Sequence, residues 1–330
     1  MSEVVFSNRL DRSDMPALSS QVRTDEGPSI SQKTRSHSPA NLVPYKPGRL
    51  PSANSAKIIS GAVILSLVVI AALGAPLLAP HDPNAQDLLR TLEPSVWSGG
   101  SAEFVLGTDS LGRCVLSRVI YGARVALLVG TIAPVGALLL GTVIAVLAGY
   151  FGRIIDAIVS RAVDIWMSFP PIIMALILMI SLKPGLKNVI LAIVIVDWTR
   201  FCRLVRGETL TLMKRDYVPA ARIAGAHHLR VIIFELLPGL FPLLVTLLTI
   251  EIGIAIIIES VLSFVGHSMA PDIPTWGVMV ADGLGTMYQQ PVALITPMIA
   301  IVLTVLGANL LGEGLRKALD PRLIVREGLT

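Results

Sequence analysis

Two acidic residues interrupt a long apolar stretch of this 330-residue chain and are the first candidates for binding chemistry. The stretch from Leu236 to Gly266 holds Glu251 and Glu259 and no other charged residue. A carboxylate inside a hydrocarbon layer is costly, so it should face a bundle interior, a partner helix or water. We therefore expect Glu251 either to contact a cationic group of a solute, such as an ammonium, or to form an internal hydrogen bond. Glu259 is expected to serve packing or a gate.

A second charged pair, Asp109 and Arg113, flanks Gly112 in the polar segment after the first apolar stretch. One interpretation places both side chains at the outer mouth of a pathway through the protein. The other interpretation is structural, because an aspartate in a turn accepts hydrogen bonds from nearby backbone amides. The residues alone leave both interpretations open.

Motifs for bond chemistry are missing from the sequence. It has no Gly-rich phosphate loop ending in Gly-Lys-Ser/Thr, no His-Glu-x-x-His helix and no Gly-x-Ser-x-Gly elbow. His227 and His228 are adjacent, and adjacent side chains on a helix point in different directions, which is poor spacing for a metal site. We expect no catalytic residue, no metal and no bound cofactor in this chain, and no ATP hydrolysis by it.

The composition indicates that these residues are held in a membrane. Hydrophobic residues make up 53% of the chain and charged residues only 15%, whereas a soluble domain usually carries about 25% charged residues. The net charge of +4 does not indicate a nucleic-acid partner, because excess Lys and Arg in a membrane protein mostly mark cytoplasmic loops.

The apolar runs predict an all-α membrane protein with about six transmembrane helices. A helix needs about 20 apolar residues to cross the hydrocarbon core, and it satisfies its own backbone hydrogen bonds there. The expected spans are 58–80, 125–149, 165–182 with a helix that starts near Asp156, 186–205, 236–266 and 292–311. The fourth is the least apolar, because Asp197, Arg200 and Arg203 interrupt it.

Two local features of the third span are also predicted. Arg161 and Asp164 are three residues apart, so they share a helix face and are expected to pair. Phe169, Pro170 and Pro171 follow, and the prolines remove backbone donors from the helix ladder. We therefore expect a kink at this point, either as a hinge or to accommodate packing.

The basic residues predict the orientation of the chain. With the amino terminus inside, the cytoplasmic loops collect most of the Lys and Arg, and the outer loop 266–291 has none. This pattern predicts a multi-pass protein of a bacterial inner membrane with both termini cytoplasmic. Residues 1–56 are polar and are expected to form a disordered cytoplasmic tail, 57–323 the transmembrane domain, and 324–330 a cytoplasmic carboxyl-terminal tail.

The cytoplasmic segment 207–234 is longer than a simple connection between two spans requires. Pro219 suits the first turn of a short helix, whose amino terminus Asp216 favours by its charge. Gly225 can end this helix in a left-handed conformation. Such a helix would lie across the end of the bundle and fit a groove on another protein. The small-residue face of the helix is formed by Ala220, Ala221 and Ala224. Leu237 and Pro238 mark the entry to the fifth span.

This segment resembles the "EAA" coupling loop of ABC importer permeases. Ala220-Ala221, Gly225 and Leu237-Pro238 match the motif, while Pro219 replaces its glutamate, as is familiar in the peptide and nickel branch. Further motifs in the same order resemble the second, C-type permease of that branch. They are 106–113, 121–124, Trp198, 203–207, 259–266, 276–277, 309–316 and 320–322. The sequence departs from the family at Cys114, Glu235 and Gly239, where Asp, His and Asn are common.

The resemblance implies a subunit of a type I ABC importer that carries di- or oligopeptides or a similar solute by alternating access. The implied partners are a homologous permease chain in a heterodimer, two ATPase subunits that use ATP and Mg²⁺, an extracytoplasmic solute-binding protein, and the lipid bilayer. Nickel-chelate, glutathione and opine importers share the same motifs. An ion-coupled secondary transporter is the alternative outside the family, with Glu251 or Asp197 as the ion site. A membrane-embedded enzyme is disfavoured by the missing motifs.

Overall fold

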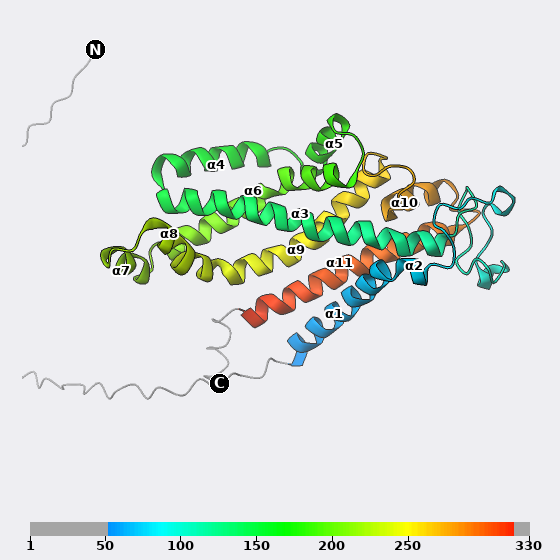
Figure 1. Ribbon diagram of the computed structural model, residues 1–330, viewed down its shortest axis with the longest axis horizontal. Helices are drawn as coiled ribbons and strands as arrows, with labels where there is room; N and C mark the ends of the chain where they lie inside the picture. The colour runs from blue at the N-terminus through cyan, green and yellow to red at the C-terminus, as the bar shows by residue number, and fades with distance from the viewer. Residues whose placement is uncertain (1–51, 320–330) are drawn as a thin grey trace, which may run out of the picture. The chain divides into compact units, whose positions relative to one another are not determined.

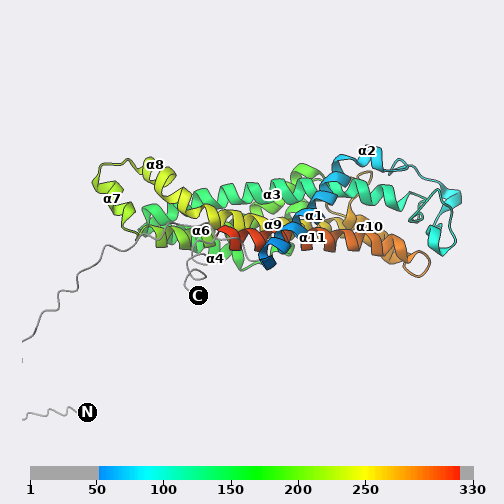
Figure 2. The same cartoon turned by 90° about the horizontal axis from the view of Figure 1, so that it is seen from below.

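The computed structural model describes residues 52–319, and every named element in this range is a helix (Figures 1 and 2). Of the tail expected at 1–56, residues 1–51 lie outside the described part, as does the tail 324–330. The long and medium helices are α1 (Ser52–Leu73), α3 (Val115–Phe151), α4 (Arg153–Met167), α5 (Pro171–Ser181), α6 (Leu186–Leu212), α9 (Leu237–Phe264), α10 (Trp276–Gly285) and α11 (Pro291–Leu319). The short ones are α2 (Ala75–Leu78), α7 (Tyr217–Ile223) and α8 (His228–Arg230), the 3-10 turns Leu88–Arg90 and Val96–Ser98, and a π-helix, Val231–Leu236.

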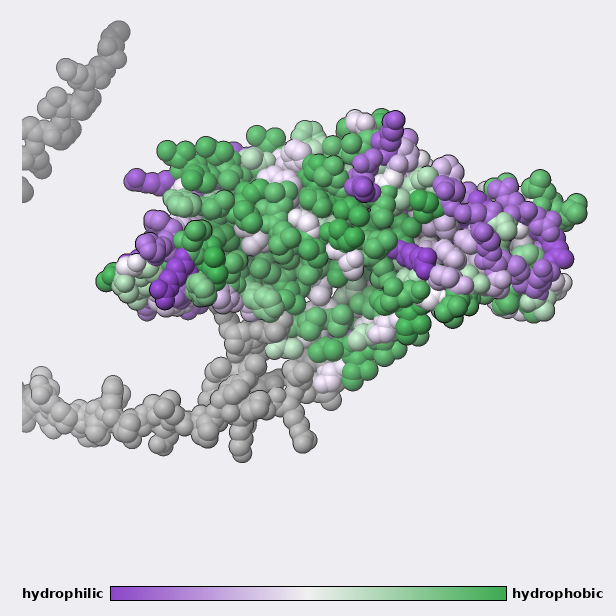
Figure 3. Space-filling model, viewed as in Figure 1, coloured by the Kyte–Doolittle hydropathy of each residue, from purple (hydrophilic) through white to green (hydrophobic). Residues whose placement is uncertain are grey.

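Four helices of the described part are long and apolar enough to cross a membrane, and α4 with α5 forms a fifth candidate if the bent pair is one span. The four are Ser55–Leu73, Val115–Phe151, His228–Phe264 and Pro291–Ala318. Helix α6 is the expected fourth span and is 27 residues long, but its charged residues lower its hydropathy. Figure 3 shows the apolar side chains spread along the helices, with polar ones gathered at the end formed by the loop 79–114.

The third expected span is broken rather than gently kinked. Its two halves, α4 and α5, meet at 85°. Pro171 forces the preceding residue out of the helical conformation, and Pro170 is extended at ψ 128°. Pro171 then opens α5, where the missing N–H costs nothing. The two prolines therefore end one helix and start another in a new direction.

Helix α3 lies at the centre and packs against α6 and α9, its main neighbours. Close approach to α6 depends on Gly141, where an added Cβ would lie 2.5 Å from the Trp198 carbonyl oxygen. Helix α1 packs along α11 in the same way, because Gly61 and Gly307 leave room for the neighbouring backbone and side chains. Dispersion and small-residue packing of this kind hold helices together in lipid, where water does not drive their association.

Candidate functional site

The connection between α6 and α9, residues 213–236, carries α7 and α8 and is called the coupling segment below. It lies at the end of the bundle opposite the loop 79–114 (Figures 1 and 2). Val218 in α7 is 1% exposed and belongs to the apolar cluster that contains Leu212, Leu236 and Leu240. One side of α7 therefore packs on the ends of the spans, and the other side is exposed in the part of the chain that the structure describes.

Helix α7 begins at Tyr217, two residues before Pro219, so the proline falls in its first turn and loses no hydrogen bond. Asp216 occupies the cap position and its carbonyl oxygen accepts from the Ala220 amide at 3.1 Å. Its side chain makes no capping hydrogen bond. The side chain of Asp216 therefore acts on the helix only through its negative charge.

The carboxyl end of α7 is closed by a Schellman motif built on Gly225. The Ala226 amide donates to the Ala221 carbonyl oxygen, and the Gly225 amide to that of Arg222. Gly225 has φ +84°, the left-handed conformation that its sequence position predicted. Ala221 and Ala226 are both partly buried against the same apolar cluster as Val218. The turn fixes the angle at which the chain leaves α7.

Two contacts fasten the coupling segment to the end of α3. The Tyr150 hydroxyl lies 2.7 Å from Nδ1 of His228. The Arg222 guanidinium lies over the Tyr150 ring, 4.6 Å from its centroid. His228 therefore has a structural role in joining the coupling segment to α3. The sequence, in which it simply follows His227, did not predict this contact. Tyr150 was not predicted as part of this site, because its partners are distant in sequence.

The outer face of the coupling segment is small and apolar. Pro219, Ala220 and Ala224 are exposed, and the Ile223 side chain is 88% exposed. Further exposed apolar side chains are Leu229 and Phe234. Apolar groups clustered at the end of a bundle and flanked by basic residues indicate a surface that another protein covers.

The coupling segment continues directly into α9. The π-helix Val231–Leu236 joins α8 to Leu237, and residues 228–264 form one continuous helical stretch. Pro238 lies in the first turn of α9, and the Gly239 position is within van der Waals reach of Leu212 and Tyr217. The coupling segment thus packs against the ends of both α6 and α9. No sequence pattern predicted the π-helix.

A cluster of three charged residues lies deeper in the bundle, where α6 faces α9. Glu251 of α9 is 5% exposed, and its Oε1 accepts from Arg200 Nη1 of α6 at 3.4 Å. Asp197 is fully buried, and its Oδ1 lies 3.9 Å from Arg200 Nε. This geometry favours the internal interpretation of Glu251 over direct contact with a solute.

Glu259 lies two turns further along α9 and is 1% exposed. Its Oε1 accepts hydrogen bonds from the Ser263 hydroxyl at 2.5 Å and from the Ser268 hydroxyl at 3.3 Å. Ser268 follows the end of α9, so Glu259 ties the turn after the helix back to its last part. This arrangement suits the packing role expected for Glu259.

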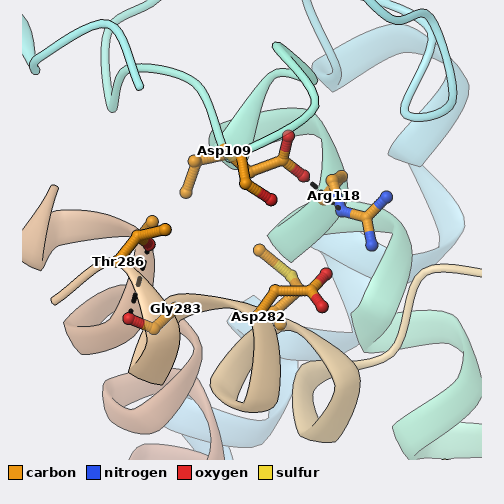
Figure 4. A pocket seen from close by; sticks show the side chains of 9 residues that line it. Asp109, Arg118, Asp282, Gly283 and Thr286 are labelled. Atoms are coloured by element: carbon orange, nitrogen blue, oxygen red, sulfur yellow. Dashed lines mark hydrogen bonds and ion pairs between the residues drawn. The ribbon is translucent and has the colours of Figure 1, made fainter. Parts of the chain in front are cut away.

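At the opposite end of the bundle, the buried residues Asp109 and Arg113 form a charge cluster with the buried Arg118 and the partly exposed Asp282. Figure 4 shows Asp109, Arg118 and Asp282 of this cluster. Asp109 accepts from the amides of Leu111 and Arg113, each at 2.9 Å, and from Arg113 Nε at 2.6 Å. These are the backbone hydrogen bonds of the structural interpretation. Arg113 Nη2 reaches Asp282 of α10 at 3.1 Å, which joins the loop to α10.

Arg118 was missed by the sequence reasoning. It is 1% exposed at the start of α3, 3.7 Å from Asp109, and lines a cavity of about 10 Å³, the space of a single water molecule. Asp282 lines the same cavity, and Figure 4 shows both residues. The only signal was its place three residues after Val115, inside the first turn of a helix whose only other charged residue is Arg124. The cluster holds the outer loop, α3 and α10 together.

The loop 79–114 contains a carboxylate with a shifted pKa. Glu93 accepts hydrogen bonds from Ser101, which hold the pKa of Glu93 below its usual value. The Glu93 carbonyl oxygen also accepts from Nε2 of Gln290, a buried residue that precedes α11. The loop is therefore fastened at its middle as well as at its ends.

One predicted ion pair is wrong. Asp164 does not pair with Arg161 but with Arg203 of α6, at 2.7 Å. Asp156, eight residues or about two turns earlier in α4, likewise pairs with Arg206 of α6. An Arg on a neighbouring helix offers a better approach than one three residues away on the same helix. These two pairs join α4 to α6.

Two family models match the sequence. Residues 141–325 match the binding-protein-dependent transport system inner membrane component, and residues 52–94 match the N-terminal TM domain of oligopeptide transport permease C. The first match covers the end of α3 and then α4, α5, α6, the coupling segment, α9, α10 and α11.

Several curated proteins are similar over most of their length. The di/tripeptide transport system permease protein DppC of Pseudomonas aeruginosa is 38% identical over 266 residues, which is 80% of this chain and 88% of that protein. The glutathione transport system permease protein GsiD of Pectobacterium atrosepticum is 38% identical over 267 residues, 81% and 87% of the two chains. A putative peptide transport system permease protein of Brucella suis is 40% identical over 266 residues, 80% and 88%.

Proposed function

Because the chain belongs to the family of binding-protein-dependent transport system inner membrane components, we propose that it forms half of the peptide pathway in an ATP-driven importer. It is a multi-pass inner-membrane permease subunit of the C type, and it is not itself an enzyme. The other half of the pathway is a homologous permease chain. Two separate ATPase subunits supply the energy from ATP and Mg²⁺, and an extracytoplasmic binding protein delivers the solute.

The observation that carries this proposal is the form of the coupling segment. It has an exposed apolar face around Ile223, a seated face around Val218, and a continuous helical link from His228 into α9. A docking helix needs an accessible side for its partner and a stiff connection to the spans. Both features are present here, so movement of a docked ATPase subunit would displace α9, which continues from the coupling segment without a break.

The proposed cycle is alternating access. Binding of ATP closes the two ATPase subunits and brings the coupling segments of the two permease chains together, which opens the spans outward. Hydrolysis resets the inward-facing state. This cycle requires the coupling segment on the cytoplasmic side, with both chain termini there as well, and the Arg and Lys residues of the segment favour that side.

The proposed solutes are short peptides. The relatives are named as dipeptide, di/tripeptide and glutathione permeases, and glutathione is itself a modified tripeptide. Peptides carry both an ammonium and a carboxylate, so a pathway for them must tolerate both charges. Nickel-chelate and opine importers remain alternatives within the family on the motifs alone. An ion-coupled secondary transporter is not favoured, because the coupling segment would then have no function.

Reconstitution tests the proposal. The complex of both permease chains and both ATPase subunits is placed in proteoliposomes, with binding protein and labelled dipeptide on one side and ATP on the other. We expect uptake that requires ATP and stops with vanadate. Uptake by this chain alone, driven only by a proton or sodium gradient, would refute the proposal.

A further inference from the structure

Helices α6 and α9 are the two spans that the coupling segment joins, and one cluster of charges connects them inside the bundle. This cluster, called the Arg200 cluster, consists of Asp197 and Arg200 on α6 and Glu251 on α9. Glu251 is the only one of the three on α9. Any displacement of α9 relative to α6 therefore changes the distance from Arg200 to Glu251, while Asp197 moves with Arg200.

The two carboxylates of the cluster differ in their contacts with Arg200. Glu251 accepts a hydrogen bond from Arg200 Nη1 at 3.4 Å, which is long for a charged pair. Asp197 lies 3.9 Å from Arg200 Nε, beyond hydrogen-bond length, and neither of its carboxylate oxygens has a hydrogen-bond partner among the residues that the structure describes. Asp197 is nevertheless the more deeply buried of the two, at 0% exposed.

A buried carboxylate without a donor is destabilising by about 1–3 kcal/mol or more, so its presence needs an explanation. The guanidinium carries five N–H donors, and its one hydrogen bond here is to Glu251. Asp197 is one helical turn from Arg200 on the same helix face. A change in the Arg200 side-chain rotamer is enough to bring the two groups together, without movement of α6 itself.

The space that such a change requires lies beside Arg200. A cavity of about 170 Å³ lies between the break of α4 and α5 and the middle of α6, and Arg200 and Val196 line it. The Arg200 side chain is 34% exposed, whereas those of Asp197 and Glu251 are 1% and 7% exposed. Arg200 is thus the member of the cluster that is free to move.

We infer that Arg200 changes its carboxylate partner during transport, from Glu251 in the present state to Asp197 when the coupling segment displaces α9. Asp197 is the acceptor of the second state, which explains why it makes no hydrogen bond to Arg200 in the first, although the two groups lie only 3.9 Å apart. Arg200 is a positioning residue for the transport cycle and not a ligand for the solute. The inference rests on the proposed function, because it assigns the displacement of α9 to the coupling segment.

The same helix provides a matched control. Arg203, three residues after Arg200, pairs with Asp164 of α4 at 2.7 Å and makes no contact with α9 in the described residues. Its ion pair joins α6 to α4 and not to α9. Loss of this pair should not affect the movement of α9 relative to α6.

The experiment compares Asp197→Asn, Asp197→Glu and Arg203→Gln in the reconstituted complex. Asp197→Asn keeps the volume and the present Arg200–Glu251 contact but removes the charge of the second partner. We expect uptake to fall by about tenfold, with the ATPase no longer stimulated by loaded binding protein. Asp197→Glu, which restores the carboxylate, should recover part of both, and Arg203→Gln should stay near the unmodified complex.

A second measurement does not depend on how the variants fold. Spin labels at positions 204 on α6 and 250 on α9, both exposed in this chain, report the separation of the two helices in the otherwise unmodified complex. We expect different distances in the nucleotide-free and vanadate-trapped states. An unchanged distance, or an Asp197→Asn complex that transports and responds normally, would overturn the inference. The unmodified complex would still show ATP-driven uptake, so the proposed function would stand.

Discussion

The Tyr150 hydroxyl at the end of α3 lies 2.7 Å from the Nδ1 atom of His228 in the coupling segment. This contact joins the central span of the bundle to the part of the chain that we propose meets the ATPase. Because Arg222 also lies over the same ring, Tyr150 has two partners in the coupling segment.

Replacement of Tyr150 by Phe should weaken the coupling of hydrolysis to transport. The ring and its contact with Arg222 remain, and one hydrogen bond is lost, which corresponds to about 1 kcal/mol. We expect fewer peptides imported per ATP hydrolysed, measured in proteoliposomes, with normal assembly of the complex. Tyr121→Phe, at the other end of α3, is the control. If the Tyr150→Phe complex imports as many peptides per ATP as the unmodified complex, Tyr150 has no role in coupling.

Gly225 should not tolerate a side chain. Its φ of +84° costs a non-glycine residue about 1–2 kcal/mol, although the space around it is open. We expect Gly225→Ala to reduce uptake and Gly225→Asp to abolish both uptake and co-purification of the ATPase subunits, with membrane insertion intact. Gly207→Ala is the comparison, because Gly207 has open space and no positive φ. Normal uptake by Gly225→Asp would refute the docking role of this turn.

Ile223 and Val218 lie on opposite sides of α7, so substitutions at the two positions should have different effects. Ile223 is 88% exposed, so Ile223→Asp should release the ATPase subunits without lowering the thermal stability of the chain. Val218 is buried, so Val218→Ala should lower stability by about 1–2 kcal/mol through loss of packing. Pull-down and thermal unfolding in detergent measure the two effects. ATPase binding that survives Ile223→Asp would contradict the assignment of the docking face.

Asp109 should be essential for the outer part of the fold. It accepts hydrogen bonds from two amides and from Arg113, and it lies near the fully buried Arg118. Asp109→Ala leaves two buried guanidinium groups with less compensation, which typically costs about 3–5 kcal/mol. Thermal unfolding of the complex should show a large loss, whereas the exposed Asp272→Ala should show none. A small effect of Asp109→Ala on thermal stability would contradict the structural role and favour a role for Asp109 and Arg113 at the outer mouth of the pathway.

Glu251 permits a test of its two interpretations. Since it is 5% exposed and bonded to Arg200, we expect Glu251→Gln to slow uptake of a free dipeptide and of its N-acetylated form to the same extent. The maximal rate should change more than the apparent KM. A loss of affinity confined to the free dipeptide would instead show that Glu251 contacts the ammonium of the solute.

The positions of the spans and of the short helix at Pro219 were predictable because apolar run length, proline and glycine act locally. Gly225 is an example, since its left-handed conformation follows from the end of a helix and needs no distant partner. Contacts between distant residues were not predictable. Asp164 pairs with Arg203 and not with Arg161, and Arg118 lies beside Asp109. Each contact depends on how separate segments of the chain are placed in the fold. The 85° break at Pro170 exceeds what two prolines alone indicate.

Cross-linking of residue 223 tests the central claim most directly. In a variant whose only cysteine replaces Ile223, with Cys114 and Cys202 changed to Ala, a short bifunctional reagent is added to the assembled complex. We predict a covalent product between this chain and an ATPase subunit, formed only when reagent reaches the cytoplasmic side. A cysteine at position 223 that reacts from the outside of intact cells, or that never joins an ATPase subunit, would contradict the account.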